Sequence, residues 1–354
     1  MIHWLLLAGP VAIALERMEA GAPLVFFCAA LAIVPLATLI VHSTEHLSAR
    51  TGPALGGLLN ATFGNLPELI IAMVALRAGM LEMVRASLIG AILANLLLAL
   101  GIAFLLGGLR HHVQEYNPAA ARTYATMMTL AALSMVVPSS FHRLLGVEAP
   151  RHAQGLDIGV AIVLLTAYVL YLVFMIRTHP DFFTAARVAE ADDHARWSLP
   201  RAGATLLLAS LGAAWMSETL VGAAEATGHA LGMSPLFIGI VLLAVVGGAA
   251  ESGAAIAMGR KNQMDLAVGI AMGSSMQIAL FVTPILVLVS GLLAPERLTL
   301  GFSRIEIGAL FFSVLIGGQV AGDGRSNWYK GIQLVAFYLI LATMFYLIPA
   351  ESAP

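Results

Sequence analysis

Residues 58–72 read LLNATFGNLPELIIA, and residues 241–255, 183 positions later, read VLLAVVGGAAESGAA. Each stretch places one glutamate, Glu68 or Glu251, in an otherwise almost wholly apolar segment. The flanking matches at the same offset are Gly64, Ala72, Arg77 and Gly90 in the first copy, and Gly247, Ala255, Arg260 and Gly273 in the second. A charged side chain at bilayer depth costs about 2.5 to 3.5 kcal/mol on insertion scales, so a duplicated one predicts an ion or proton site at a repeat interface.

The composition excludes an ordinary soluble domain. Of the 354 residues, 60% are hydrophobic and 11% are charged, whereas about a quarter of the residues of a soluble domain are charged. The net charge is -2 and no basic block occurs, so we expect no nucleic-acid partner. The expected surroundings of most of the chain are therefore the lipid bilayer.

About eleven apolar segments are long enough to cross a membrane as helices, which takes about 17 to 25 residues. We expect them at residues 3–16, 23–43, 53–76, 84–107, 122–145, 156–176, 203–228, 235–259, 265–290, 303–320 and 329–348. The distribution of Arg and Lys among the connections favours a cytoplasmic N-terminus. The predicted fold class is an all-α polytopic membrane protein of about 11 transmembrane helices.

The two motifs divide the chain into repeats. We expect an extra N-terminal span at residues 1–20, a first five-helix repeat at 21–177 with its motif at 58–101, a cytoplasmic linker at 178–200, and a second repeat at 201–350 with its motif at 239–284. The motifs begin in the third and eighth spans, and an odd number of crossings reverses direction, so the second repeat is inverted. Inverted repeats let one central site face either side of the membrane in turn, which favours a carrier over a pore. Whether the short first segment is a retained span or a signal-peptide core stays open.

Residues near both glutamates predict a cation site built from oxygen atoms. Gly64 and Pro67 in the first copy, and Gly247 with its neighbour Gly248 in the second, loosen the helix so that backbone carbonyls can turn toward an ion. The side chains that we expect to contribute are Glu68, Glu251, Asn65, Asn95, Gln277 and Ser274. An all-oxygen set suits a hard divalent cation such as Ca²⁺, and protons would compete with it for the same carboxylates.

The two motifs resemble the alpha-repeats of the Ca²⁺/H⁺ antiporter (cation exchanger) family over about residues 23–348. The matching stretches are LLNATFGN at residues 58–65 with Glu68, and AAE at residues 249–251 with GSSMQIALFV at residues 273–282. The resemblance implies that the two glutamates hold Ca²⁺ and exchange it for protons, assisted by Asn65, Asn95 and Gln277. It also implies a gating or proton-relay role for Glu45 and Glu218, which we expect near the ends of the second and seventh spans.

The expected activity is export of Ca²⁺ from the cytoplasm in exchange for H⁺ by alternating access, without a cofactor, in a bacterial inner membrane. A Na⁺/Ca²⁺ or other cation exchanger of the same fold stays an alternative, because Gly248 and Ser252 replace an Asn and a His that are usual in the family. A cation channel is a further alternative. A membrane zinc enzyme is an alternative from another class, because His42, Glu45 and His46 fit the H-x-x-E-H pattern. The oligomeric state is not predicted.

Overall fold

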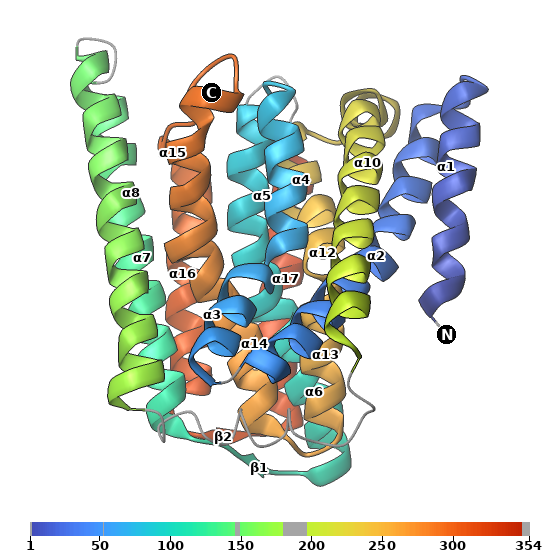
Figure 1. Ribbon diagram of the computed structural model, residues 1–354. Helices are drawn as coiled ribbons and strands as arrows, with labels where there is room; N and C mark the ends of the chain where they lie inside the picture. The colour runs from blue at the N-terminus through green and yellow to red at the C-terminus, as the bar shows by residue number, and fades with distance from the viewer. Residues whose placement is uncertain (1, 52, 146–148, 180–196, 349–354) are drawn as a thin grey trace. The chain divides into compact units, whose positions relative to one another are not determined.

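The computed structural model describes residues 2–51, 53–145, 149–179 and 197–348, and almost all of them are helical (Figure 1). Within these ranges, eight helices are long and apolar enough to cross a membrane, and a ninth results if the broken pair Pro235–Gly247 and Ala249–Arg260 counts as one span. Every expected span coincides with a helical segment, although those at 3–16 and 53–76 are too short or too broken to meet the same length criterion. The prediction of an all-α polytopic membrane protein is confirmed, whereas the number eleven stays a prediction.

Exposed apolar side chains line the outer faces of the long helices. Leu207, Leu208 and Leu211 are exposed on one such helix, and Val163 and Leu170 on another. In water this would be unfavourable, but lipid tails are as apolar as these side chains. The surface pattern therefore agrees with helices that face hydrocarbon.

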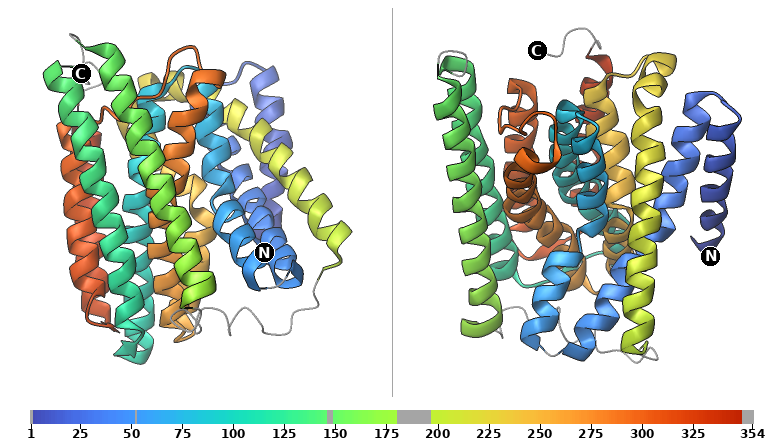
Figure 2. Two further views of the ribbon diagram at one scale, coloured as in Figure 1. Left: turned by 60° about the vertical axis from the view of Figure 1, so that its left-hand side comes forward. Right: turned by 45° about the horizontal axis from the view of Figure 1, so that its top comes forward.

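The helices group into two compact units, each of which takes segments from both predicted repeats. Among the described residues, unit 1 comprises 2–51, 53–91, 197–250 and 342–348. It contains a 3-10 helix at Ile2–Leu7, α1 (Ala8–Arg17), α2 (Ala22–Thr51), α3 (Pro53–Phe63), α4 (Leu66–Arg77), most of α5 (Leu81–Leu93), α10 (Leu199–Leu231), α11 (Pro235–Phe237), a π-helical segment at Ile238–Leu243, and α12 (Ala244–Gly247). Helices α1, α2 and α10 lie side by side (Figure 2), with Phe26, Ile33 and Leu220 buried in their shared core.

Two glycines let α5 approach the π-helical segment Ile238–Leu243 closely within unit 1. A Cβ atom on Gly90 would lie 2.1 Å from the carbonyl oxygen of Ile240, and one on Gly239 would lie 2.5 Å from the Cβ of Ala86. Neither position has room for a side chain. We call this pair of approaches the glycine contact.

Among the described residues, unit 2 comprises 92–145, 149–179 and 251–341. It contains a π-helical segment at Ala94–Ala99, α6 (Leu100–His111), β1 (Gln114–Glu115), α7 (Pro118–Leu145), α8 (Pro150–Val173), a π-helical segment at Phe174–Thr178, most of α13 (Ala249–Arg260), α14 (Met264–Gln277), a π-helical segment at Ile278–Val282, α15 (Thr283–Leu293), α16 (Arg304–Ala321), β2 (Arg325–Ser326) and most of α17 (Trp328–Leu347). Helix α7 packs against α16 and α14, and α8 packs against α15.

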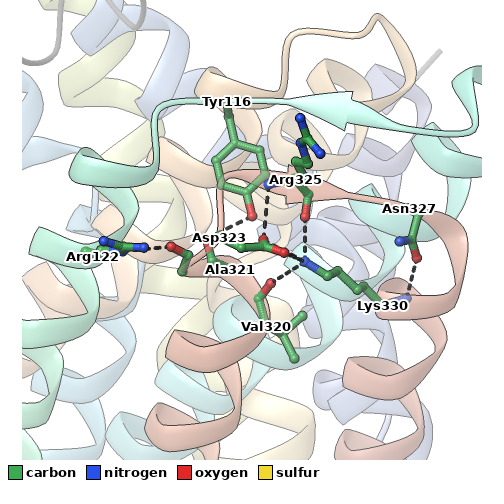
Figure 3. Close-up of polar contacts among 9 residues, drawn as sticks. Tyr116, Arg122, Val320, Ala321, Asp323, Arg325, Asn327 and Lys330 are labelled. Atoms are coloured by element: carbon green, nitrogen blue, oxygen red, sulfur yellow. Dashed lines mark hydrogen bonds and ion pairs between the residues drawn. The ribbon is translucent and has the colours of Figure 1, made fainter.

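One end of unit 2 is held together by a two-stranded ribbon, in which β1 and β2 pair antiparallel with Gln114 opposite Ser326. Beside it, the Nζ atom of Lys330 donates to both carboxylate oxygens of Asp323 at 2.6 Å and to two backbone carbonyls, of Arg325 at 2.7 Å and of Val320 at 3.1 Å (Figure 3). Partial burial acts to raise the pKa of Asp323, but the hydrogen bond and charge of Lys330, together with hydrogen bonds from the backbone, outweigh it and hold that pKa below its usual range. We call this arrangement the lysine cluster.

A second polar cluster of unit 2 fixes the extended segment before α16. Asp157 of α8 is buried, lies 2.8 Å from the Nε2 of His142 of α7, and accepts a hydrogen bond from the backbone N–H of Leu300 at 3.3 Å. Ser139 of α7 donates to the carbonyl of Leu300 at 2.6 Å and accepts from the N–H of Phe302 at 3.1 Å. These bonds satisfy backbone groups that cannot pair within a helix or sheet, so they tie this segment to α7 and α8.

Candidate functional site

Both conspicuous glutamates stand in the first turn of a helix that follows a break. Helix α3 ends at Phe63 and α4 begins at Leu66, while α12 ends at Gly247 and α13 begins at Ala249. The prediction that the helix loosens beside Glu68 and Glu251 is confirmed. Because the N-terminal end of a helix carries a partial positive charge, it favours an ionised carboxylate in its first turn.

Element boundaries repeat with the motifs. Helices α4 and α13 begin and end 183 positions apart, and so do the starts of α5 and α14. The π-helical segments Ala94–Ala99 and Ile278–Val282 end at the same spacing. π-Helical segments are rare in proteins, and those that occur often lie at functional sites. Here one contains Asn95 and the other directly follows Gln277.

Glu68 occupies a tight, buried position in unit 1. The residue is 7% exposed, and neither carboxylate oxygen has a hydrogen-bond partner from another residue in the part of the chain that the structure describes. Gly247 leaves space for it, because a Cβ there would lie 3.1 Å from Cγ of Glu68. Asn65, the N-cap residue of α4, is also buried, and its carbonyl accepts from the N–H of Leu69 at 3.1 Å. Gly64 lies in the break itself.

Glu251 is likewise 7% exposed, in unit 2. In the same unit, the side-chain Nδ2 of Asn95 donates to the hydroxyl of Ser274 at 3.0 Å, which joins two residues predicted as site residues from opposite halves of the chain. Gln277, partly buried, ends α14. Asn95 is 1% exposed, so its amide is a polar group buried where the π-helical segment Ala94–Ala99 packs against α14.

Glu45 and Glu218 are exposed residues of α2 and α10, which pack against each other in unit 1. Glu45 lies near the end of α2, as expected, but Glu218 lies in the interior of α10, because that helix continues to Leu231. The expectation that Glu218 stands near the end of its span is therefore wrong. In the zinc pattern of α2, the ring of His46 stacks on Trp197 with the ring centroids 4.7 Å apart.

Sequence reasoning missed the part played by two residues. It assigned Gly247 to the cation through its carbonyl, whereas the structure also shows it as the space that accommodates Glu68. It treated Ser252 only as a missing ligand, whereas the Ser252 hydroxyl donates to Oδ1 of Asn95 at 3.4 Å. Both contacts join segments far apart in the chain, and no local pattern announces them.

Comparisons with known proteins agree along the whole chain. The family model described as sodium/calcium exchanger protein matches residues 21–177 and 202–347. A Ca²⁺/H⁺ antiporter of Synechocystis sp. is 39% identical over 361 residues, which cover 98% of this chain and 96% of the relative. The Ca²⁺/H⁺ antiporter ChaA of Bacillus subtilis is 38% identical over 342 residues, which cover 96% of both chains. The solved structure of native YfkE has a TM-score of 0.85 and 36% identity, covering 98% of this chain and 100% of that one.

Proposed function

This chain belongs to the sodium/calcium exchanger protein family, and from that membership we propose that it is a secondary transporter that exchanges Ca²⁺ for protons across a membrane. Its relatives named Ca²⁺/H⁺ antiporter match it over nearly their whole length, and the motifs around Glu68 and Glu251 resemble the same family. The protein is a transporter and not an enzyme, it needs no cofactor, and its substrates are Ca²⁺ and H⁺. An ion gradient supplies the driving force.

The observation that supports the site most directly is the burial of Glu68 without a hydrogen-bond partner from another described residue. An ionised carboxylate in this setting is costly unless a cation lies against it, and a protonated one avoids the cost. The group therefore has two stable conditions, cation-bound and protonated. Glu251, its counterpart in the second motif, has the same burial and helix position, so we assign both glutamates to cation and proton binding.

The remaining site residues are neutral and contribute oxygen atoms or space. They are Asn65, Asn95, Gln277, Ser274, Gly64 and Gly247. The bond between Asn95 and Ser274 and the close approach of Gly247 to Glu68 support this assignment. Glu45 and Glu218 are assigned to gating or proton relay, because they are exposed acids on the packed pair α2 and α10.

The topology follows the duplication. We assign residues 21–177 and 201–350 to two inverted five-helix repeats, residues 1–20 to an extra helix, and residues 178–200 to a cytoplasmic linker, most of which lies outside the described residues. The repeated element boundaries and the two stretches matched by the family model support the division. We place the N-terminus in the cytoplasm of a bacterial cell, the protein in its inner membrane, and the direction of Ca²⁺ transport outward.

Proteoliposomes with an imposed pH gradient test the proposal. In wild-type protein, protons that flow down their gradient should drive Ca²⁺ across the membrane in the opposite direction. Glu68→Gln and Glu251→Gln should each abolish this Ca²⁺ flux, because an amide keeps the shape of the side chain but neither ionises nor binds a proton. Glu225→Gln, which changes an exposed glutamate of α10, is the matched control and should transport normally. Wild-type flux in either site variant would refute the mechanism. Repeating the assay with Mn²⁺ and Na⁺ measures the selectivity among the three cations. Ca²⁺ flux that follows a Na⁺ gradient instead of a pH gradient would favour a Na⁺/Ca²⁺ exchanger.

A further inference from the structure

Three side chains of unit 2 form a short polar chain beside Glu251. Ser252, the residue after this glutamate on α13, donates to Oδ1 of Asn95 at 3.4 Å. The Nδ2 of the same amide donates to Ser274 of α14 at 3.0 Å. We call the three residues the amide bridge. It joins the first turn of α13 to the π-helical segment Ala94–Ala99 and to α14.

The amide bridge restricts a group that would otherwise rotate. A side-chain amide has an oxygen that accepts and a nitrogen that donates, and it turns about a soft terminal torsion. Because Asn95 is held from both sides, the plane of its amide is fixed, and its oxygen faces the turn of α13 that carries Glu251. Ser252 occupies only one of the two lone pairs of that oxygen, so the oxygen retains the capacity to bind a cation.

Ser252 is the part of the amide bridge on the glutamate-bearing helix. Without its hydroxyl, the amide would keep only its contact with Ser274, which can donate as well as accept and so permits either end of the amide to face α13. One of those orientations would present N–H groups, which repel a cation. Loss of Ser252 should therefore weaken cation binding without removing a ligand.

The amide bridge has no counterpart in the other copy of the motif. The positions 183 residues away from Ser252, Asn95 and Ser274 hold Leu69, Ile278 and Ala91, which are all apolar. The duplication therefore does not account for the bridge. The amide bridge supplies the surroundings of Glu251 with neutral polar groups that the first copy lacks at the same positions.

We propose that Ser252 is a positioning residue that holds the Asn95 amide oxygen toward the first turn of α13, as a neutral cation ligand beside Glu251. This rests on the proposed cation exchange. The expected effect is on affinity for the cation and not on the rate of turnover, because Ser252 acts through the orientation of another side chain. One net hydrogen bond is typically worth a factor of about five, equivalent to about 1 kcal/mol.

The test measures Ca²⁺ dependence of pH-driven uptake in proteoliposomes. Ser252→Ala should raise the half-saturating Ca²⁺ concentration about fivefold with the maximal rate retained, and Ser252→Thr, which keeps the hydroxyl, should restore the wild-type value. Ser313→Ala removes a buried hydroxyl that bonds only within α16 among the bonds described, to Ala309, and is the matched control that should leave affinity unchanged. In an Asn95→Ala background, Ser252→Ala should have no further effect, since its action runs through that amide.

Two results would overturn the inference while leaving the proposed function intact. One is a Ser252→Ala variant with wild-type affinity. The other is a further loss of affinity when Ser252→Ala is added to Asn95→Ala, because Ser252 would then not act through that amide. Failure of the proposed function is distinct, since wild-type protein would then show no Ca²⁺ uptake driven by a pH gradient.

Discussion

The glycine contact in unit 1 predicts that adding a single methyl group at residue 90 is severely destabilising. In Gly90→Ala, the new Cβ would lie 2.1 Å from the carbonyl oxygen of Ile240 and 2.4 Å from its Cα. Ordinary contact begins at about 3.4 Å, so α5 and the facing π-helical segment would have to separate by about 1.3 Å. The three nearest atoms all belong to the backbone of Ile240, so no rotamer change relieves the clash.

The expected cost is about 3 kcal/mol, the upper end of the range for overpacking a tightly packed core. Gly273, the counterpart of Gly90 in the second motif, supplies the matched control. There the nearest atoms to a new Cβ belong to the ring of Tyr124, at 3.8 Å, and nothing needs to move. Since Ala is favoured over Gly within a helix by up to about 1 kcal/mol, Gly273→Ala should be neutral or slightly stabilising.

Thermal unfolding of the purified variants in one detergent measures the difference, with Ca²⁺ uptake as a second readout. We expect a clearly lowered melting temperature and reduced uptake for Gly90→Ala, and near wild-type values for Gly273→Ala. Equal melting temperatures for the two variants would contradict the close backbone approach on which the prediction depends. A wild-type melting temperature for Gly90→Ala alone would contradict it as well.

Three further predictions concern other contacts. Gly247→Ala places a Cβ 3.1 Å from Cγ of Glu68, which must shift by a few tenths of an ångström, so uptake assays should show weaker Ca²⁺ affinity at nearly unchanged melting temperature; an unchanged affinity would refute the role of this space. Asp157→Ala removes the acceptor of the buried Leu300 N–H and the partner of the partly buried His142 ring. It should lower the unfolding free energy by about 3 kcal/mol in thermal or denaturant melts, and a loss below about 0.5 kcal/mol would contradict the geometry. The pKa of Asp323 is lowered in the folded protein, so its bond to Lys330 should stabilise the fold fully above pH 3.8, the ordinary pKa, and progressively less as the pH falls through the lowered value. The melting-temperature difference between wild type and Asp323→Asn should therefore shrink on acidification, and a constant difference would refute this.

Local chemistry made the helix breaks predictable. Pro67 and Gly64 act on their own stretch of backbone, and Gly247 and Gly248 do the same in the second motif, so the sequence alone indicates where each helix ends. The membrane class followed from apolar length in the same way. These features depend on neighbours in the chain and need no knowledge of packing.

Contacts between distant segments could not be predicted in this way. Examples are the space that Gly247 leaves for Glu68, the hydrogen bond from Leu300 to Asp157, and the amide bridge, which all depend on which segments meet and at what rotation. The error over Glu218 has a related cause. A polar residue need not end a membrane helix when later turns continue to pack, and α10 continues for three more turns beyond it.

The lysine cluster has a consequence for a protein whose cargo is a divalent metal. A carboxylate and two carbonyls converge there on one point, and such a group of oxygens attracts free Ca²⁺. The ammonium of Lys330 already occupies that point, and because it is attached to the same polypeptide, it competes for these oxygens as an intramolecular partner. A positive charge that belongs to the chain itself thus fills the position that a metal ion would need in order to bind these oxygens.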